Sequence, residues 1–111
     1  MSDVQATLAQ RGSRYGAFTG HAQVTQQLKR VIFHGLRERN KMLDDDMLEA
    51  LDMICHKIGR IVNGDPAYAG SWHDIAGYAK LVDDRLVAAQ ALDSVSDDPI
   101  HSALSGGGSQ S

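Results

Sequence analysis

The chain has 111 residues, a formal net charge of −3 and only 5% aromatic residues. This length fits one domain, and the acidic balance argues against nonspecific binding of duplex nucleic acid, which requires a surplus of Lys and Arg. Strand-forming residues are scattered singly, whereas Ala, Leu, Met, Gln, Lys and Arg fill the periodic segments, and this pattern predicts an all-α fold. Because no apolar run approaches about 18 residues and no signal-peptide pattern is present, we expect a cytoplasmic protein that does not enter a membrane.

The amino-terminal part predicts two helices separated by a loop. A short helix is expected from Asp3 to Gln10, ending near Gly12. Residues 11–18 are predicted to form a glycine-punctuated loop, whose two cations and two aromatics also suit contacts to a phosphate or a base. A second helix is expected from about Gly20 to Leu36. Its apolar side would consist of Val24, Leu28, Val31 and Ile32.

The clearest helical pattern covers residues 47–62, where apolar residues recur on one side and ionisable residues on the other. The three aspartates 44–46 before it favour the helix dipole and can supply an N-cap, although a triple-aspartate metal loop is an alternative. Cys55 falls on the apolar side, so we expect it to be buried and reduced. The ionisable side suits a metal and phosphates, or is simply the solvated side of the helix.

Residues 63–66, Asn-Gly-Asp-Pro, are expected to end this helix. Ser71 would cap a fourth helix over about residues 72–92, with Asp74 completing a capping box. The helices over 47–62 and 72–92 should pack as an antiparallel pair, because the connection between them is short. Residues 1–95 would then form one domain of about four main helices, followed by a flexible Ser/Gly-rich tail over residues 96–111.

The antiparallel pair would gather candidate site residues near the turn. Lys57 and Arg60 suit phosphate oxygens, and aromatic side chains suit a base. The predicted ligand-binding residues are Arg11, Arg14, Tyr15, His56, Lys57, Arg60 and Trp72.

Carboxylates at helical spacing suggest a metal site in the same region. Glu49 and Asp52, at an i, i+3 spacing, and Asp74 from the facing helix are predicted ligands of Mg²⁺, which prefers oxygen. Two alternatives that involve no metal remain open: Asp52 can pair with His56 on the surface, and Asp74 can serve only as a cap. Three further histidines have no partner by spacing and are expected on the surface: His21, His34 and His101.

Three blocks, over residues 11–18, 56–65 and 71–79, resemble a family of small phage and prophage proteins of uncharacterised function. This resemblance implies an infected host cell as the location. The chain is also distantly similar to the MazG-like all-α nucleoside triphosphate pyrophosphohydrolases, whose paired acidic residues hold Mg²⁺. Residues 49–52 resemble the first acidic pair, and residues 71–74 the second, with Ser in place of one Glu. That replacement removes the charge of one oxygen ligand.

These features favour a phage-encoded protein that binds a nucleotide or a nucleotide-derived small molecule and sequesters a host immune signal. An alternative is Mg²⁺-dependent cleavage of a nucleoside triphosphate by a metal-bound water. A further alternative is a protein-binding inhibitor that docks on a host factor. We also expect a homo-oligomer, because one small helical chain leaves little buried volume for a nucleotide pocket.

Overall fold

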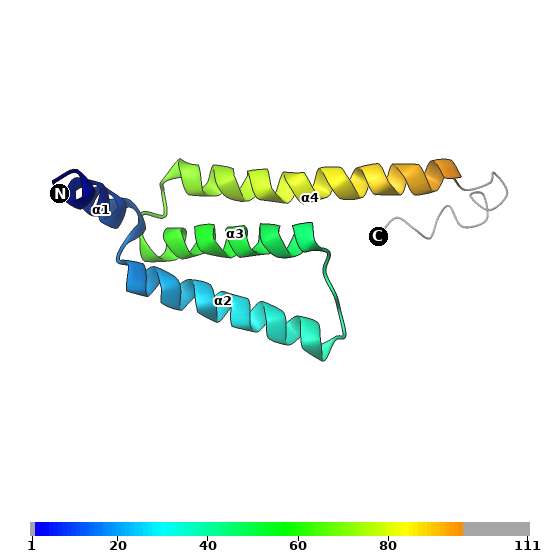
Figure 1. The fold of residues 1–111 in the computed structure, drawn as a ribbon, viewed down its shortest axis with the longest axis horizontal. Helices are drawn as coiled ribbons and strands as arrows, with labels where there is room; N and C mark the ends of the chain where they lie inside the picture. The colour runs from blue at the N-terminus through cyan, green and yellow to red at the C-terminus, as the bar shows by residue number, and fades with distance from the viewer. Residues whose placement is uncertain (1, 97–111) are drawn as a thin grey trace.

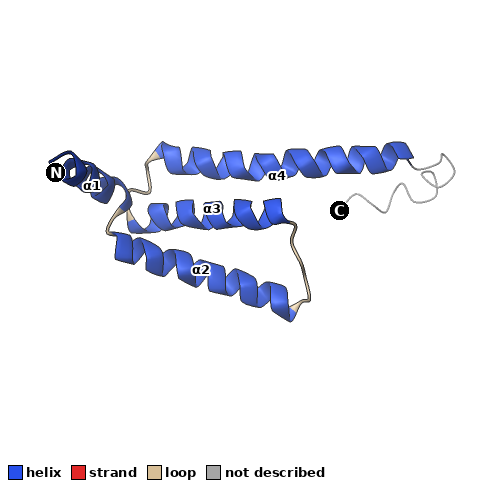
Figure 2. Cartoon of the chain, viewed as in Figure 1, coloured by secondary structure: helices blue, strands red, loops and turns tan. Residues whose placement is uncertain are grey.

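The computed structural model describes residues 2–96, which form four α-helices (Figure 1). The helices are α1 (Ser2–Tyr15), α2 (Phe18–Glu38), α3 (Asp45–Asn63) and α4 (Ala69–Ser96). No strand occurs within residues 2–96 (Figure 2), so the predicted all-α fold is confirmed. None of the four helices has the length and apolar composition needed to cross a bilayer. The tail predicted over residues 96–111 lies, beyond Ser96, outside the described residues.

Three of the helices form a single layer, with α1 at one end (Figure 1). α3 is the central helix and packs against α2 on one side and α4 on the other. α3 and α4 run antiparallel, as the short connection predicts. Because α4 is much longer than α3, its carboxyl-terminal part extends past the beginning of α3.

α1 is longer than predicted. It continues through Gly12 to Tyr15, so the loop expected over residues 11–18 is reduced to Gly16 and Ala17. Gly16 has a φ of +80°, the left-handed conformation that favours glycine, and therefore ends the helix. A glycine within a helix costs only about 1 kcal/mol, which contacts made farther along the helix can offset.

α4 begins at Ala69 rather than at Trp72, so Ser71 is not the N-cap. Ser71 lies within the first turn and is only 3% exposed. The chain is turned instead by Asp65, whose carboxylate accepts a hydrogen bond of 3.0 Å from the amide of Ala67. An aspartate that bonds to the backbone two residues on is typical of a turn.

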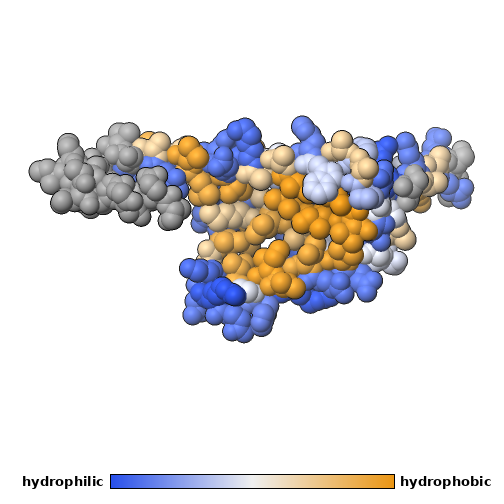
Figure 3. Space-filling model, turned by 180° about the vertical axis from the view of Figure 1, so that it is seen from behind, coloured by the Kyte–Doolittle hydropathy of each residue, from blue (hydrophilic) through white to orange (hydrophobic). Residues whose placement is uncertain are grey.

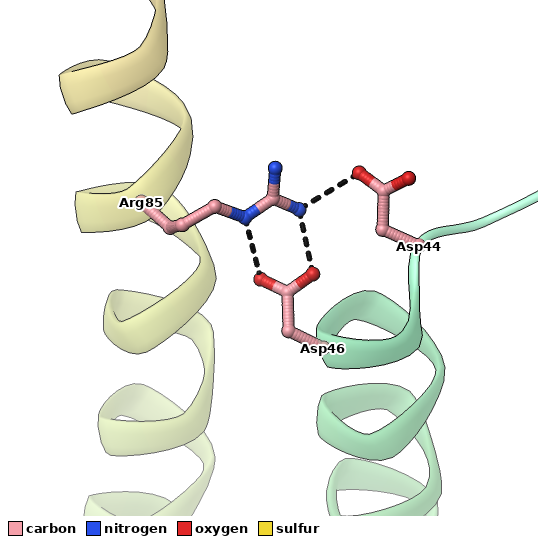
Figure 4. A network of polar contacts seen from close by, with 3 residues as sticks. All are labelled: Asp44, Asp46 and Arg85. Carbon is pink, nitrogen blue, oxygen red and sulfur yellow. Dashed lines mark hydrogen bonds and ion pairs between the residues drawn. The ribbon is translucent and has the colours of Figure 1, made fainter.

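The aspartates at the start of α3 bind α4. Asp44 occupies the N-cap position, but its side chain makes no capping hydrogen bond. Arg85 of α4 donates two hydrogen bonds to Asp46, of 2.9 and 2.6 Å, and one of 2.9 Å to Asp44 (Figure 4). A bidentate guanidinium pair fixes orientation as well as distance, so this network sets how α3 and α4 lie at this end.

Burial in the layer is shallow. Among the described residues the buried hydrophobic side chains are Ala50 and Cys55, and the position predicted for Cys55 is confirmed. Val31, predicted on the apolar side of its helix, is 72% exposed. The seam between α2 and α3 instead buries two polar side chains of α2, His21 and Thr25. Because the layer is one helix thick, side chains are buried only where neighbouring helices meet, and both faces of the layer are exposed to solvent.

Candidate functional site

A pocket of about 490 Å³ opens where α1, the start of α2 and the end of α3 meet. A second hollow of about 250 Å³ adjoins it. Both hollows are lined by Arg11, Tyr15 and Arg60, and we call the two together the arginine pocket. The larger hollow is also lined by Leu8, Gly16, Ala17, Phe18, His21 and His56. The smaller one is completed by Thr7, Gln10 and Arg14.

Helical spacing explains how these side chains come together. Arg11, Arg14 and Tyr15 are related by i, i+3 and i, i+4 steps, so the continuation of α1 to Tyr15 puts them on one side of one helix. His56 and Arg60 are four apart on α3 and share a side in the same way. An irregular loop over residues 11–18 would not have imposed this alignment.

Two arginines of the pocket are held over aromatic rings. The Cζ atom of Arg60 lies 4.2 Å from the ring centroid of Tyr15. The Cζ atom of Arg14 lies 4.4 Å from that of Tyr68, and its Nη1 donates a 3.4 Å hydrogen bond to the Tyr68 hydroxyl. The two rings meet edge to face with their centroids 6.2 Å apart. A guanidinium stacked on a ring is held in place while its edge still offers N–H donors.

Asn63, at the end of α3, binds the segment that connects α1 to α2. Its Nδ2 donates hydrogen bonds to the carbonyl oxygens of Tyr15 at 3.0 Å and of Ala17 at 2.8 Å. The amide of Asp65 donates a 2.7 Å bond to the carbonyl of Arg14. The sequence pattern assigned Asn63 only to the end of α3. Its side chain in fact binds the last carbonyl of α1 and that of Ala17 before α2, and thereby fixes the turn from which the pocket is built.

His21 and His56 form a hydrogen-bonded pair inside the larger hollow. Nε2 of His21 lies 3.1 Å from Nδ1 of His56, and the ring planes are almost perpendicular, at 88°. His21 is 6% exposed, so its expected surface position is wrong. No spacing pattern could have found it, because its partner is on another helix.

Both histidines of the pair are neutral at pH 7. Burial lowers the pKa of His56 to about 4, and the positive charge of Arg60 contributes to this shift. Burial and the same arginine lower the pKa of His21, against the opposing effect of a backbone contact with Gly59. One ring therefore donates the shared proton and the other accepts it.

The lining of the arginine pocket carries an excess of positive charge. Neither hollow is lined by Asp or Glu. Within residues 2–96, no ion pair joins a carboxylate to Arg11, Arg14 or Arg60. In a chain of net charge −3, this local excess of arginine is an attractive field for an anion.

Two of the predicted ligand-binding residues lie outside the pocket. Nζ of Lys57 is 2.9 Å from Oδ2 of Asp74, and the Lys57 side chain is only 11% exposed, so it joins α3 to α4. The indole nitrogen of Trp72 donates a 2.8 Å hydrogen bond to the carbonyl of Pro66. The remaining predicted residues, Arg11, Arg14, Tyr15, His56 and Arg60, line the arginine pocket.

The three predicted Mg²⁺ ligands do not come together. Oδ1 of Asp52 lies 3.6 Å from Nζ of Lys29 on α2, Asp74 pairs with Lys57, and Glu49 is exposed. Across residues 2–96, no three Asp, Glu, His or Cys side chains are grouped so as to hold a metal ion. Two of the three carboxylates thus neutralise lysines in this arrangement, and the Mg²⁺ site stays a prediction.

Comparisons of the chain with models of protein families, with curated proteins and with solved structures found no match. The resemblances to a phage family and to the MazG-like enzymes therefore stay predictions.

Proposed function

We propose that the arginine pocket binds a nucleotide or a nucleotide-derived small molecule. The observation that carries this proposal is the convergence of Arg11, Arg14 and Arg60 on two adjoining hollows whose lining contains no carboxylate. Guanidinium groups bind phosphate oxygens through paired, charge-assisted hydrogen bonds. Two of these groups are already oriented by aromatic rings, which reduces the entropy lost when a ligand binds.

The two hollows differ in a way that matches the two parts of a nucleotide. The smaller hollow is polar, with Thr7 and Gln10 beside the arginines, and suits the phosphates. Both hollows share the ring of Tyr15, and the larger one adds the ring of Phe18 and the histidine pair, which suit a base. Its volume of about 490 Å³ falls in the usual range for small-molecule sites, about 300–1,000 Å³.

Binding is favoured over hydrolysis by the chemistry of the lining. Metal-dependent cleavage of a triphosphate requires carboxylates that hold Mg²⁺ beside the phosphates, and the lining of the arginine pocket offers none. Binding without turnover is also the property expected of a phage protein that sequesters a nucleotide signal of its host.

The proposal is tested by calorimetric titration of the full chain with linear and cyclic nucleotides. We expect at least one ligand to bind, and Arg11→Ala and Arg60→Ala each to weaken it about 30-fold, which is about 2 kcal/mol for a lost charged hydrogen bond. The matched control is Arg37→Ala, an exposed arginine at the other end of α2, which should bind as the wild type does.

Two outcomes would contradict the proposal. One is the absence of any ligand across the panel, which would favour the protein-binding alternative. The other is a ligand that both pocket variants bind with unchanged affinity. Analysis of phosphate products after incubation with nucleoside triphosphates and Mg²⁺ separates binding from the pyrophosphohydrolase alternative, since only the enzyme would release pyrophosphate.

A further inference from the structure

At the end of the layer opposite to α1, α3 and α4 leave an apolar groove open to solvent. The groove has a volume of about 400 Å³. Every residue that lines it is apolar: Leu43, Met47, Ala50, Leu51, Ile54, Ala79, Val82 and Leu86. Seen from behind, apolar side chains also gather over the middle of the molecule (Figure 3). Contiguous apolar surface of this kind is a mark of an interaction site.

α4 extends beyond the groove. Arg85 binds Asp46 at the beginning of α3, and α4 then continues to Ser96 past the end of the layer (Figure 1). We call residues 87–96 the overhang. Its amino-terminal part is rich in apolar residues, Val87, Ala88, Ala89, Ala91 and Leu92, with Gln90 and Asp93 together on one side of the helix.

The overhang exposes large apolar side chains to solvent. Val87 is 56% exposed and Leu92 is 70% exposed. The apolar side of an amphipathic helix normally packs against a partner surface, and a helical stretch of about ten residues without such packing is marginal in water. The segment therefore calls for a covering surface outside the described part of this chain.

We propose that the overhang of one copy lies in the apolar groove of a second copy. Leu86 belongs to the groove and immediately precedes the overhang, so the two surfaces meet at one point of α4. A two-fold axis near Leu86, with the two α4 helices antiparallel, lays each overhang along the groove of the other copy. Such an interface is isologous, and both grooves are filled at once.

The lengths of the two surfaces agree. Along α4 the groove reaches from Leu86 back to Ala79, which at 1.5 Å per residue is about 10 Å. The overhang is about 15 Å long and therefore covers this distance. Because the groove is apolar throughout, it offers no charge to select a polar or ionic partner. This inference is independent of the proposed nucleotide site, which lies at the other end of α3.

Sedimentation of the full chain tests the proposal. The wild type is expected to be a dimer at tens of micromolar, and Leu92→Glu should raise the dissociation constant at least 30-fold, because the new carboxylate would have to be buried in the groove. Leu92 is 70% exposed in the single chain, so this variant should fold. Val62→Glu, on α3 and 63% exposed outside the groove, is the matched control and should remain dimeric.

Crosslinking tests the position of the axis. In a Cys55→Ala background, Leu86→Cys should be joined between copies by a short bismaleimide, whereas Val62→Cys should not. The proposal is overturned by a monomeric wild type, by an oligomer whose mass Leu92→Glu leaves unchanged, or by a dimer without the Leu86→Cys crosslink. If the wild type is a monomer, the groove would instead be expected to bind a helix of another protein.

Discussion

His21 and His56 give the stability of the protein a pH dependence of known sign. Their pKa values are lowered in the folded state, that of His56 from 6.5 to about 4. In the unfolded chain the same rings bind a proton near pH 6.5, so acid favours unfolding. The stabilising contribution is complete above pH 6.5 and is lost as the pH falls toward about 4.

We therefore expect the urea midpoint to decrease between pH 7 and pH 5. His56→Gln should flatten this dependence, because glutamine keeps hydrogen-bonding groups but does not titrate. Among the acids of residues 2–96, Asp46 and Asp74 have lowered pKa values because Arg85 and Lys57 donate hydrogen bonds to them, so their contribution to stability is lost only at lower pH. An identical slope in wild type and His56→Gln would show that another group titrates in this window.

At the scale of helices, the approach of α2 to α3 depends on Gly59. A Cβ atom at this position would lie 2.6 Å from Oγ1 of Thr25 and 2.9 Å from Nδ1 of His21. Both side chains are buried in the seam, so neither can move away without displacing its neighbours.

Gly59→Ala should destabilise the protein by about 1–3 kcal/mol, since overpacking outweighs a helix-propensity gain of about 1 kcal/mol. Gly77→Ala is the matched control, because a Cβ at Gly77 meets nothing within 4 Å. It should stabilise α4 by about 0.5–1 kcal/mol. Chemical denaturation of both variants measures the difference, and equal effects would mean that the seam is loosely packed.

The existence of the four helices could be predicted from periodicity, but their ends could not. α1 continues past Gly12 because its last two residues make hydrogen bonds to distant parts of the chain. Arg14 bonds to Tyr68, and Tyr15 bonds to Asn63. α4 starts before Ser71 because Asp65 builds the turn. Local propensity ranks candidate caps, whereas tertiary contacts decide which one is used.

The candidate site could be predicted only in part, because it too depends on contacts between helices. Arg11, Arg14 and Arg60 were found as cations near aromatics, and they do line one pocket. Lys57 was predicted to bind phosphate from the polar side of α3, but α3 is the central helix and has a neighbour on that side, so the lysine pairs with Asp74. His21 was missed, because its role depends on a ring that belongs to another helix.

On the scale of the whole molecule, α3 connects two separate surfaces. His56 and Arg60 near its carboxyl end line the arginine pocket, and Met47 and Ile54 nearer its amino end line the apolar groove. In the proposed dimer the two arginine pockets would lie at the outer ends and remain accessible. Substitutions at one end should therefore leave the other function intact, as expected for distant sites without shared partners.

The attachment of α1 at only one end makes the stability of the molecule uneven. Residues 3–11 are exposed, and the helix is tied down near its last turn, by Asn63 and Tyr68. A helix held in this way opens locally at a smaller free energy than the central helix, so its amide hydrogens should exchange with solvent faster than those of α3. A nucleotide that spans Arg11 and Arg60 would link the two helices, and part of its binding energy would go into ordering α1. Hydrogen exchange should slow across α1 on saturation with such a ligand, and unchanged exchange there would show that α1 takes no part in recognition.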